Sequence, residues 1–189
     1  MRCETAALTP AEIGAIARRI DRPIVLVGLM GAGKSTVGRK LAGLLQVDFV
    51  DADDAIEQAA AMTIAEIFER FGEPHFRDGE RRVIARLIGE RHGVIATGGG
   101  AFVDPQTRAL ILASTIAVFI DCDVATLVER TSRRNNRPLL QAGNPAEILE
   151  RLRAQREPLY AEAPIRVSSG SGPQHDTALQ IIEALDRWL

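Results

Sequence analysis

The sequence predicts a single three-layer α/β domain built on a parallel β-sheet. Short apolar segments alternate with longer amphipathic segments along residues 23–189. Strands without alternating polarity are typical of a parallel sheet that is covered by helices on both faces. Ligands bind beyond the carboxyl ends of such strands, so the residues that follow each strand are the candidate functional residues.

Composition limits the functional classes. The chain has 189 residues, of which 46% are hydrophobic and 25% charged, and its net charge is −2. These values indicate one ordinary globular domain and argue against binding along nucleic-acid phosphates. No apolar run reaches the roughly 20 residues of a membrane-spanning helix, and Cys3 and Cys122 have no metal-ligand or disulfide spacing. We expect a cytoplasmic monomer that binds neither nucleic acid nor membrane.

Residues 1–22 are predicted to form an accessory helical extension to a single main domain at residues 23–189. Thr9 is a candidate N-cap, Pro10 occupies the first helical position and Glu12 completes a capping box. Apolar residues then follow at helical spacing on one face: Ile13, Ile16 and Ile20.

The main domain is predicted to contain five strands and their connecting helices. The strands are expected at residues 24–27, 47–50, 94–96, 115–120 and 165–167. The helices are expected at about 34–45, at 55–91 in several segments, at 124–131 and 145–163, and from the last strand to Trp188. An arginine-rich loop at about 131–143 resembles a lid that closes on triphosphate charge.

A phosphate-binding loop follows the first strand. The segment Gly28-Leu29-Met30-Gly31-Ala32-Gly33-Lys34-Ser35 matches G-x-x-x-x-G-K-[ST] between a strand and a helix. Its glycines allow backbone N–H groups to surround phosphate oxygens, and the helix N-terminus adds partial positive charge. Lys34 can reach the β- and γ-phosphates, while the Ser35 hydroxyl can ligate Mg²⁺. The sequence therefore predicts a nucleoside triphosphate site.

Two carboxylates end the second strand. Asp51 and Asp53 are two residues apart, so their side chains are expected on one side of the chain. One can support Mg²⁺ while the other faces an acceptor hydroxyl; alternatively, this segment only caps the next helix. We expect Asp54 to be that cap, with a helix beginning near Ala55.

Three other segments carry candidate polar groups. Gly98-Gly99-Gly100 ends the third strand and lets a ligand approach the backbone. Arg77 lies in a charge-rich helical stretch, which alone is a weak signal. Arg156 precedes Pro158, which is expected to interrupt its helix. We expect the ends of the first three strands to converge on one site.

In order, these motifs resemble the shikimate kinase family from about Pro23 to the C-terminus. The matching segments are GLMGAGKST, FVDAD, FRDGE, ATGGGA, RPLL and REPLY. The resemblance implies the nucleoside monophosphate kinase type of P-loop NTPase fold. It also implies transfer of the γ-phosphoryl of ATP to the 3-hydroxyl of shikimate, in chorismate and aromatic amino acid biosynthesis.

The resemblance implies a role for each matching residue. Asp53 is the candidate general base, and Lys34 and Arg137 complete the catalytic set. The implied ATP-binding residues are Gly31, Ala32, Gly33, Lys34, Ser35, Thr36, Arg130, which stacks near the adenine, and Arg137. The implied shikimate-binding residues are Asp53, Arg77, Gly98, Gly99, Gly100 and Arg156. Ser35 ligates Mg²⁺ and Asp51 supports it. In the lid, Arg133 and Arg134 are further candidates for phosphate contact.

Two other functions remain open from the sequence. One is a kinase of another hydroxy acid, such as a gluconate-type acceptor, because that substrate also carries a carboxylate and hydroxyls. The other is a ligand-sensing regulatory module that has the fold without turnover. Such modules usually carry a DNA-binding domain, for which a 22-residue extension is too short.

Overall fold

The computed structural model describes residues 8–132, 143–170 and 172–189. Its core is a sheet of five parallel strands in the order β2-β3-β1-β4-β5. The strands are β1 (Ile24–Val27), β2 (Phe49–Asp51), β3 (Val94–Ala96), β4 (Ile116–Asp121) and β5 (Ile165–Ser168). The helices are α1 (Pro10–Arg19), α2 (Lys34–Leu45), α3 (Ala52–Ala60), α4 (Ile64–Gly89), α5 (Pro105–Ser114), α6 (Val124–Ser132), α7 (Pro145–Tyr160) and α8 (Gln174–Trp188).

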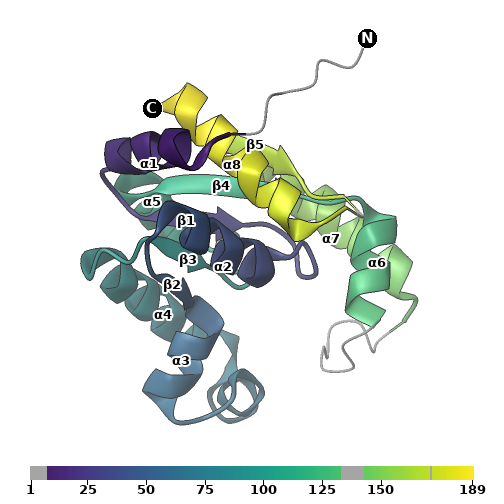
Figure 1. Cartoon of the computed structure of the whole chain (residues 1–189). Coiled ribbons are helices and arrows are strands. Elements are labelled where there is room, and N and C mark those ends of the chain that lie inside the picture. The colour runs from purple at the N-terminus through teal and green to yellow at the C-terminus, as the bar shows by residue number, and fades with distance from the viewer. Residues whose placement is uncertain (1–7, 133–142, 171) are drawn as a thin grey trace.

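The helices cover both faces of this sheet, which confirms the predicted three-layer fold. α1, α2 and α8 pack together over one face, and α4 packs against α5 on the other (Figure 1). The central strand β1 is at most 1% exposed, and Val25 pairs with Ile95 on one side and Ala117 on the other. Burial of a whole strand explains why β1 has no polar alternation.

The structure corrects several predicted element boundaries. The helical region expected from Ala55 begins at Ala52 and divides into α3 and α4, because Thr63 starts a new helix with its own capping box. Pro158 does not interrupt α7, which continues to Tyr160. The sequence analysis also missed α5, although the pair Asp104-Pro105 is a start signal and Asp104 does cap that helix.

The predicted N-terminal helix is confirmed as α1. Thr9 caps it through a capping box with Glu12, as expected. Ile13 and Ile16 are buried in the main core, so α1 is packed on the domain. No helix in the described part of the chain is both long enough and apolar enough to cross a membrane.

A histidine between two carboxylates joins the beginnings of β2 and β3, at the sheet edge away from the phosphate loop. His92 contacts Asp48 through Nδ1, and its Nε2 lies 3.1 Å from Glu90 Oε2. Asp48 also accepts a hydrogen bond from the Gly93 N–H at 2.7 Å. Partial burial alone would lower the pKa of His92, but its hydrogen bonds to Asp48 and Glu90 outweigh burial and raise that pKa.

We expect this cluster to make the stability of the protein depend on pH. Because the pKa of His92 is higher in the folded state, its stabilising effect is complete below the unfolded pKa and is lost as pH rises through the folded pKa. A partly exposed pair contributes ~0.2–1 kcal/mol, or roughly 1–3 °C in Tm. Calorimetry between pH 5.5 and 8.5 should show a smaller decline in Tm for His92→Gln than for the wild type. His175→Gln, an exposed site on α8, should retain the wild-type decline; parallel curves for the wild type and His92→Gln would contradict this role.

Candidate functional site

The phosphate loop connects β1 to α2. Gly33 is the N-cap of α2 with φ of 94°, a left-handed conformation that glycine adopts without strain. Lys34 is buried in the first turn, and its Nζ donates to the carbonyls of Gly28 and Leu29 at 2.8 and 2.9 Å. The backbone carbonyls of the loop therefore hold the ammonium group of Lys34 next to the N-terminus of α2. A helix N-terminus favours bound anions.

Ser35 and Asp51 form an oxygen pair beside this loop. Ser35 Oγ donates to Asp51 Oδ2 at 2.6 Å, and Asp51 Oδ1 accepts from the Asp53 N–H at 3.1 Å. Asp51 is thus the N-cap of α3, and the prediction that Asp54 caps this helix is wrong. One carboxylate both starts α3 and contacts the hydroxyl of the phosphate loop.

Asp53 lies in the first turn of α3, half-buried and facing the phosphate loop. Burial raises the pKa of Asp53, the negative charge of Asp51 raises it further, and the charge of Lys34 partly opposes both. A raised pKa makes a carboxylate a stronger base than an exposed aspartate.

The glycine turn after β3 is in contact with both sides of the site. A Cβ on Gly98 would lie 2.7 Å from Asp53 Oδ1, and a Cβ on Gly99 would lie 3.1 Å from the Met30 N–H nitrogen. A Cβ on Gly100 would collide with the guanidinium of Arg77. A larger residue in this turn would therefore displace Asp53, Arg77 or the phosphate loop, because the turn fits between that loop, α3 and α4.

Arg77 is positioned by Glu80, a residue that the sequence analysis did not identify. Arg77 Nη1 donates to Glu80 Oε2 at 2.7 Å, and Arg77 also pairs with Glu73. Glu80 is 1% exposed, and burial raises its pKa, although the hydrogen bond and charge of Arg77 oppose that shift. The i,i+3 spacing indicated the ion pair, but only the fold shows that the carboxylate is buried.

The same glycine turn is held from the other side by α7. Arg156 Nη1 donates to the Gly99 carbonyl at 3.2 Å, and the Tyr160 hydroxyl donates to the same oxygen. Tyr160 is 1% exposed and stacks on Phe102 and Phe119. Burial raises the pKa of Tyr160, which keeps the hydroxyl protonated as a donor. Sequence analysis missed this tyrosine because its partner is a distant backbone carbonyl.

We expect Tyr160→Phe to weaken acceptor binding by roughly three- to tenfold in KM, with little change in kcat and none in the KM for ATP. The substitution removes one hydrogen bond of about 1 kcal/mol, leaving Arg156 alone on the Gly99 carbonyl. Steady-state kinetics with each substrate varied in turn measures this split. An equal loss for both substrates would indicate general destabilisation and contradict a positioning role.

Arg130 and Gln174 border the phosphate loop on its far side. Arg130 Nη1 donates to Ala32 O at 3.3 Å and to Ser169 Oγ at 3.2 Å. Gln174 begins α8, and its Oε1 is buried without a hydrogen-bond partner in the described part of the chain. The only local signal for Gln174 is its place after Pro173 at the start of a helix.

A cavity of about 390 Å³ lies where these elements meet. Its lining includes predicted site residues from the phosphate loop, α2, β2, α3, the glycine turn and α6: Gly31, Gly33, Lys34, Ser35, Thr36, Asp51, Asp53, Gly98, Gly99 and Arg130. The cavity is bordered at the glycine turn by three further predicted residues, Gly100, Arg77 and Arg156. Ala32, in the phosphate loop, is buried. The expected lid at 131–143 lies mostly outside the described residues. Its three predicted arginines, Arg133, Arg134 and Arg137, are all outside them.

The sheet order explains this convergence. β1 lies between β3 and β4, and β2 borders β3, so the loops after β1, β2 and β3 emerge side by side. One cavity is therefore lined by the phosphate-binding loop, the oxygen pair of Ser35 and Asp51 and the carboxylate of Asp53. Arg77 and Arg156 lie beside it, against the glycine turn. This arrangement can hold a nucleoside triphosphate next to a small hydroxylated anion.

Comparisons with known proteins agree with this geometry. The family profile described as shikimate kinase matches residues 30–186. A shikimate kinase from Novosphingobium aromaticivorans is 61% identical, and the alignment covers 100% of both chains. The solved shikimate kinase from Acinetobacter baumannii in complex with shikimate has a TM-score of 0.84 and 41% identity, covering 88% of this chain and 93% of that one.

A gluconokinase from Sinorhizobium meliloti is a more distant structural neighbour. It has a TM-score of 0.57 and 18% identity, with 89% of this chain and 94% of that chain covered. At this identity the likeness extends to the fold alone, whereas the shikimate kinases match in fold and in sequence. The chain belongs to the shikimate kinase family.

Proposed function

We propose that this protein transfers the γ-phosphoryl group of ATP to the 3-hydroxyl of shikimate, in an Mg²⁺-dependent reaction that yields shikimate 3-phosphate and ADP. The observation that carries the proposal is the contact of Gly98 with Asp53 and of Gly99 with the phosphate loop. These contacts support an acceptor site that lies next to a triphosphate site, as transfer between two bound substrates requires.

The proposed acceptor site recognises one carboxylate and one hydroxyl. Arg77 and Arg156 approach the glycine turn from α4 and α7, and their guanidinium groups suit paired hydrogen bonds to a carboxylate. Asp53 faces the cavity from α3 and receives the reacting hydroxyl. These three residues match the positions that the family resemblance assigns to shikimate binding.

The residues of this chain can account for each part of the proposed phosphoryl transfer. The acceptor oxygen forms a bond to the γ-phosphorus while the bond from that phosphorus to the bridging oxygen of ADP breaks. Asp53 takes the hydroxyl proton, and its raised pKa suits that role. Lys34 and the N–H groups of residues 31–36 stabilise the phosphate charge. Arg137 is proposed to add a further positive charge from the lid.

The oxygen pair of Ser35 and Asp51 fits Mg²⁺. Both groups are hard oxygen donors, and Mg²⁺ takes few protein ligands when substrate phosphates supply the others. When bound, Mg²⁺ neutralises charge on the transferred phosphoryl group. A monomeric, cytoplasmic state stays a prediction.

A coupled assay of ADP release tests the function. We expect ADP release only with ATP, Mg²⁺ and shikimate together, with loss of activity in EDTA and recovery on adding Mg²⁺. Gluconate should support no comparable rate. Binding of ATP and shikimate without ADP release would favour a sensing module, and faster turnover of gluconate would favour the sugar-acid alternative.

A further inference from the structure

The glycine turn after β3 carries the backbone groups around which the proposed acceptor site is arranged. Arg77 of α4 lies against Gly100, and Arg156 and Tyr160 of α7 donate to the Gly99 carbonyl. The positions of both arginines relative to each other therefore depend on how the peptide groups of this turn are oriented toward α4 and α7.

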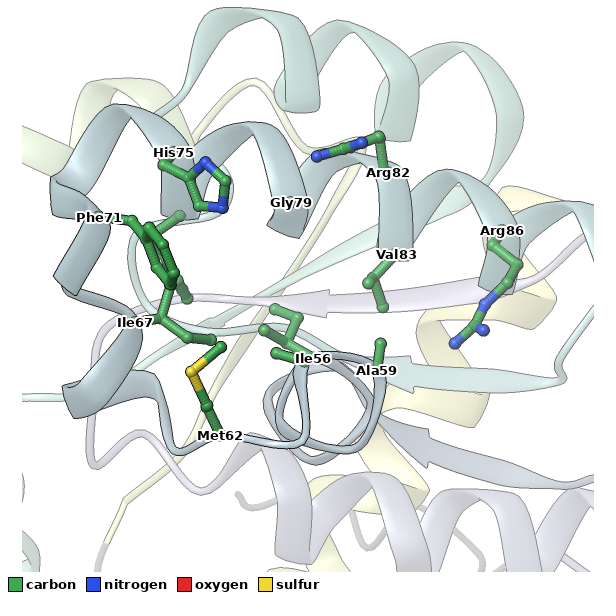
Figure 2. Close-up of a pocket in the computed structure, with 12 residues that line it drawn as sticks. Ile56, Ala59, Met62, Ile67, Phe71, His75, Gly79, Arg82, Val83 and Arg86 are labelled. Atoms are coloured by element: carbon green, nitrogen blue, oxygen red, sulfur yellow. The ribbon is translucent and has the colours of Figure 1, made fainter.

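α4 contacts the glycine turn with one face and packs on α3 with another. On the second face, Ile67, Val83 and Arg86 line a separate pocket of about 400 Å³ between the two helices (Figure 2). Arg77 is not among the lining residues of that pocket in the described part of the chain. The pocket face of α4 is thus distinct from the face that supports the turn.

Arg108 supports the turn from a third helix, α5. Its Nη1 donates to the carbonyls of Phe102 and Val103, at 3.1 Å in both cases. The Val103 N–H donates to the Gly100 carbonyl at 3.0 Å, so these two peptides continue the glycine turn directly. Phe102 is fully buried and its ring stacks on that of Tyr160. One guanidinium therefore holds two successive carbonyls at the end of the turn.

The same guanidinium connects the turn to α7. Arg108 Nε donates to Glu162 Oε2 at 3.2 Å, just beyond the end of α7 at Tyr160. The Glu162 N–H donates to the Leu159 carbonyl at 3.2 Å, which joins Glu162 to the last turn of the helix. The Arg108 side chain is 17% exposed, so water screens its charge less than that of a surface arginine. Arg108 thus bridges the glycine turn and the helix that carries Arg156.

The place of Arg108 in its own helix supports a tertiary role. It lies in the first turn of α5, after the N-cap Asp104. A positive charge is disfavoured there, because the helix dipole places partial positive charge at the N-terminus. The carbonyls of the turn and the Glu162 carboxylate, rather than α5 itself, therefore stabilise the Arg108 charge.

We propose that Arg108 is a positioning residue for acceptor binding, an inference that rests on the proposed function. It keeps the glycine turn and α7 in a fixed relation, so that Arg77 and Arg156 meet the same carboxylate. Without its donors, the Phe102 and Val103 carbonyls lose their shared partner and the turn loses its link to α7. ATP binding is expected to be spared, because Arg108 is not among the described lining residues of the phosphate-loop cavity.

Steady-state ADP release, with each substrate varied in turn, tests the inference. Arg108→Met keeps an unbranched apolar stem and removes every donor, so it should raise the KM for shikimate about tenfold or more. The KM for ATP and kcat should stay within about threefold, because the phosphate loop is untouched. Arg108→Lys should lie between the wild type and Arg108→Met, since its ammonium group keeps donors for the carbonyls. Glu162→Gln should raise the KM for shikimate by roughly two- to fivefold, because it weakens only the link to α7.

Two arginine variants serve as controls. Arg19 also joins two elements, because it pairs with the Asp186 carboxylate and donates to the Asp186 carbonyl at 3.3 Å, between α1 and α8. Arg86 lies on the pocket face of α4 (Figure 2). Arg19→Met and Arg86→Met should each leave both KM values unchanged.

The outcomes separate this inference from the proposed function. An unchanged KM for shikimate in Arg108→Met, an equal rise in both KM values, or a lower Tm as its sole effect would overturn the positioning role. If Arg108→Met does not fold, unchanged KM values for shikimate in both Arg108→Lys and Glu162→Gln would overturn it instead. A wild-type protein without shikimate-dependent ADP release would refute the proposed function itself.

Discussion

Asp53→Asn is expected to lower kcat by roughly 10²- to 10⁴-fold while the affinity for ATP stays within about twofold. Asparagine has the same shape but cannot accept the proton of the acceptor hydroxyl. In this variant the phosphate loop keeps the hydrogen bonds from Lys34 to the carbonyls of Gly28 and Leu29, which do not involve Asp53. Steady-state ADP release gives kcat, and calorimetric titration of ATP gives the affinity.

The same substitution should raise Tm at neutral pH. Burial and the charge of Asp51 raise the pKa of Asp53, so the folded protein disfavours the ionised carboxylate. The resulting stability is present below the unfolded pKa and is lost as pH rises through the folded pKa, so at pH 7 the charge is destabilising. Removing it should stabilise the protein, which is a common trade between stability and activity.

The pH dependence of the wild type provides a second measurement of this role. Because Asp53 must be ionised to accept a proton, kcat/KM should decline on the acid side at a pH above the ordinary pKa of an aspartate. Asp54→Asn is the matched control, since Asp54 is exposed on the same helix turn. Unchanged kcat in Asp53→Asn, or an equal loss in both variants, would remove Asp53 from the proposed role.

The sequence predicted the part of the site that local chemistry determines. The phosphate loop and the helix at residues 34–45 agree with α2 exactly as bounded, because the motif, its glycines and the strand before it are all local. The five strands agree within two residues at each end, since wholly apolar segments between helical ones identify buried parallel strands.

The remaining features depend on how distant elements pack. No local pattern shows that Glu80 is buried under Arg77, or that Tyr160 donates to the Gly99 carbonyl from another helix. The sequence analysis expected several helical segments in residues 55–91 but did not place the break between α3 and α4, which the capping box of Thr63 and Glu66 marks. Only the sheet order decides which of these side chains meet.

Arg77→Ala is expected to raise the KM for shikimate by roughly 10- to 100-fold or more, with the KM for ATP nearly unchanged. A charge-assisted hydrogen bond contributes ~1.5–3 kcal/mol, and each ~1.4 kcal/mol is tenfold in affinity. The effect is specific to the acceptor because the Arg77 guanidinium lies against Gly100, whereas the proposed phosphate site is the loop before α2. Steady-state kinetics with each substrate varied in turn separates the two KM values.

Arg77→Ala also leaves the buried carboxylate of Glu80 without its partner at 2.7 Å, so Tm should fall together with acceptor affinity. Arg77→Ala/Glu80→Gln removes that buried charge, and we expect it to restore Tm but not the KM for shikimate. Arg81→Ala is the matched control, since Arg81 pairs with Asp78 and does not line the cavity. Recovery of shikimate affinity in the double variant would show that Arg77 acts only by neutralising Glu80. A higher KM for ATP alone would place Arg77 in the wrong half of the site.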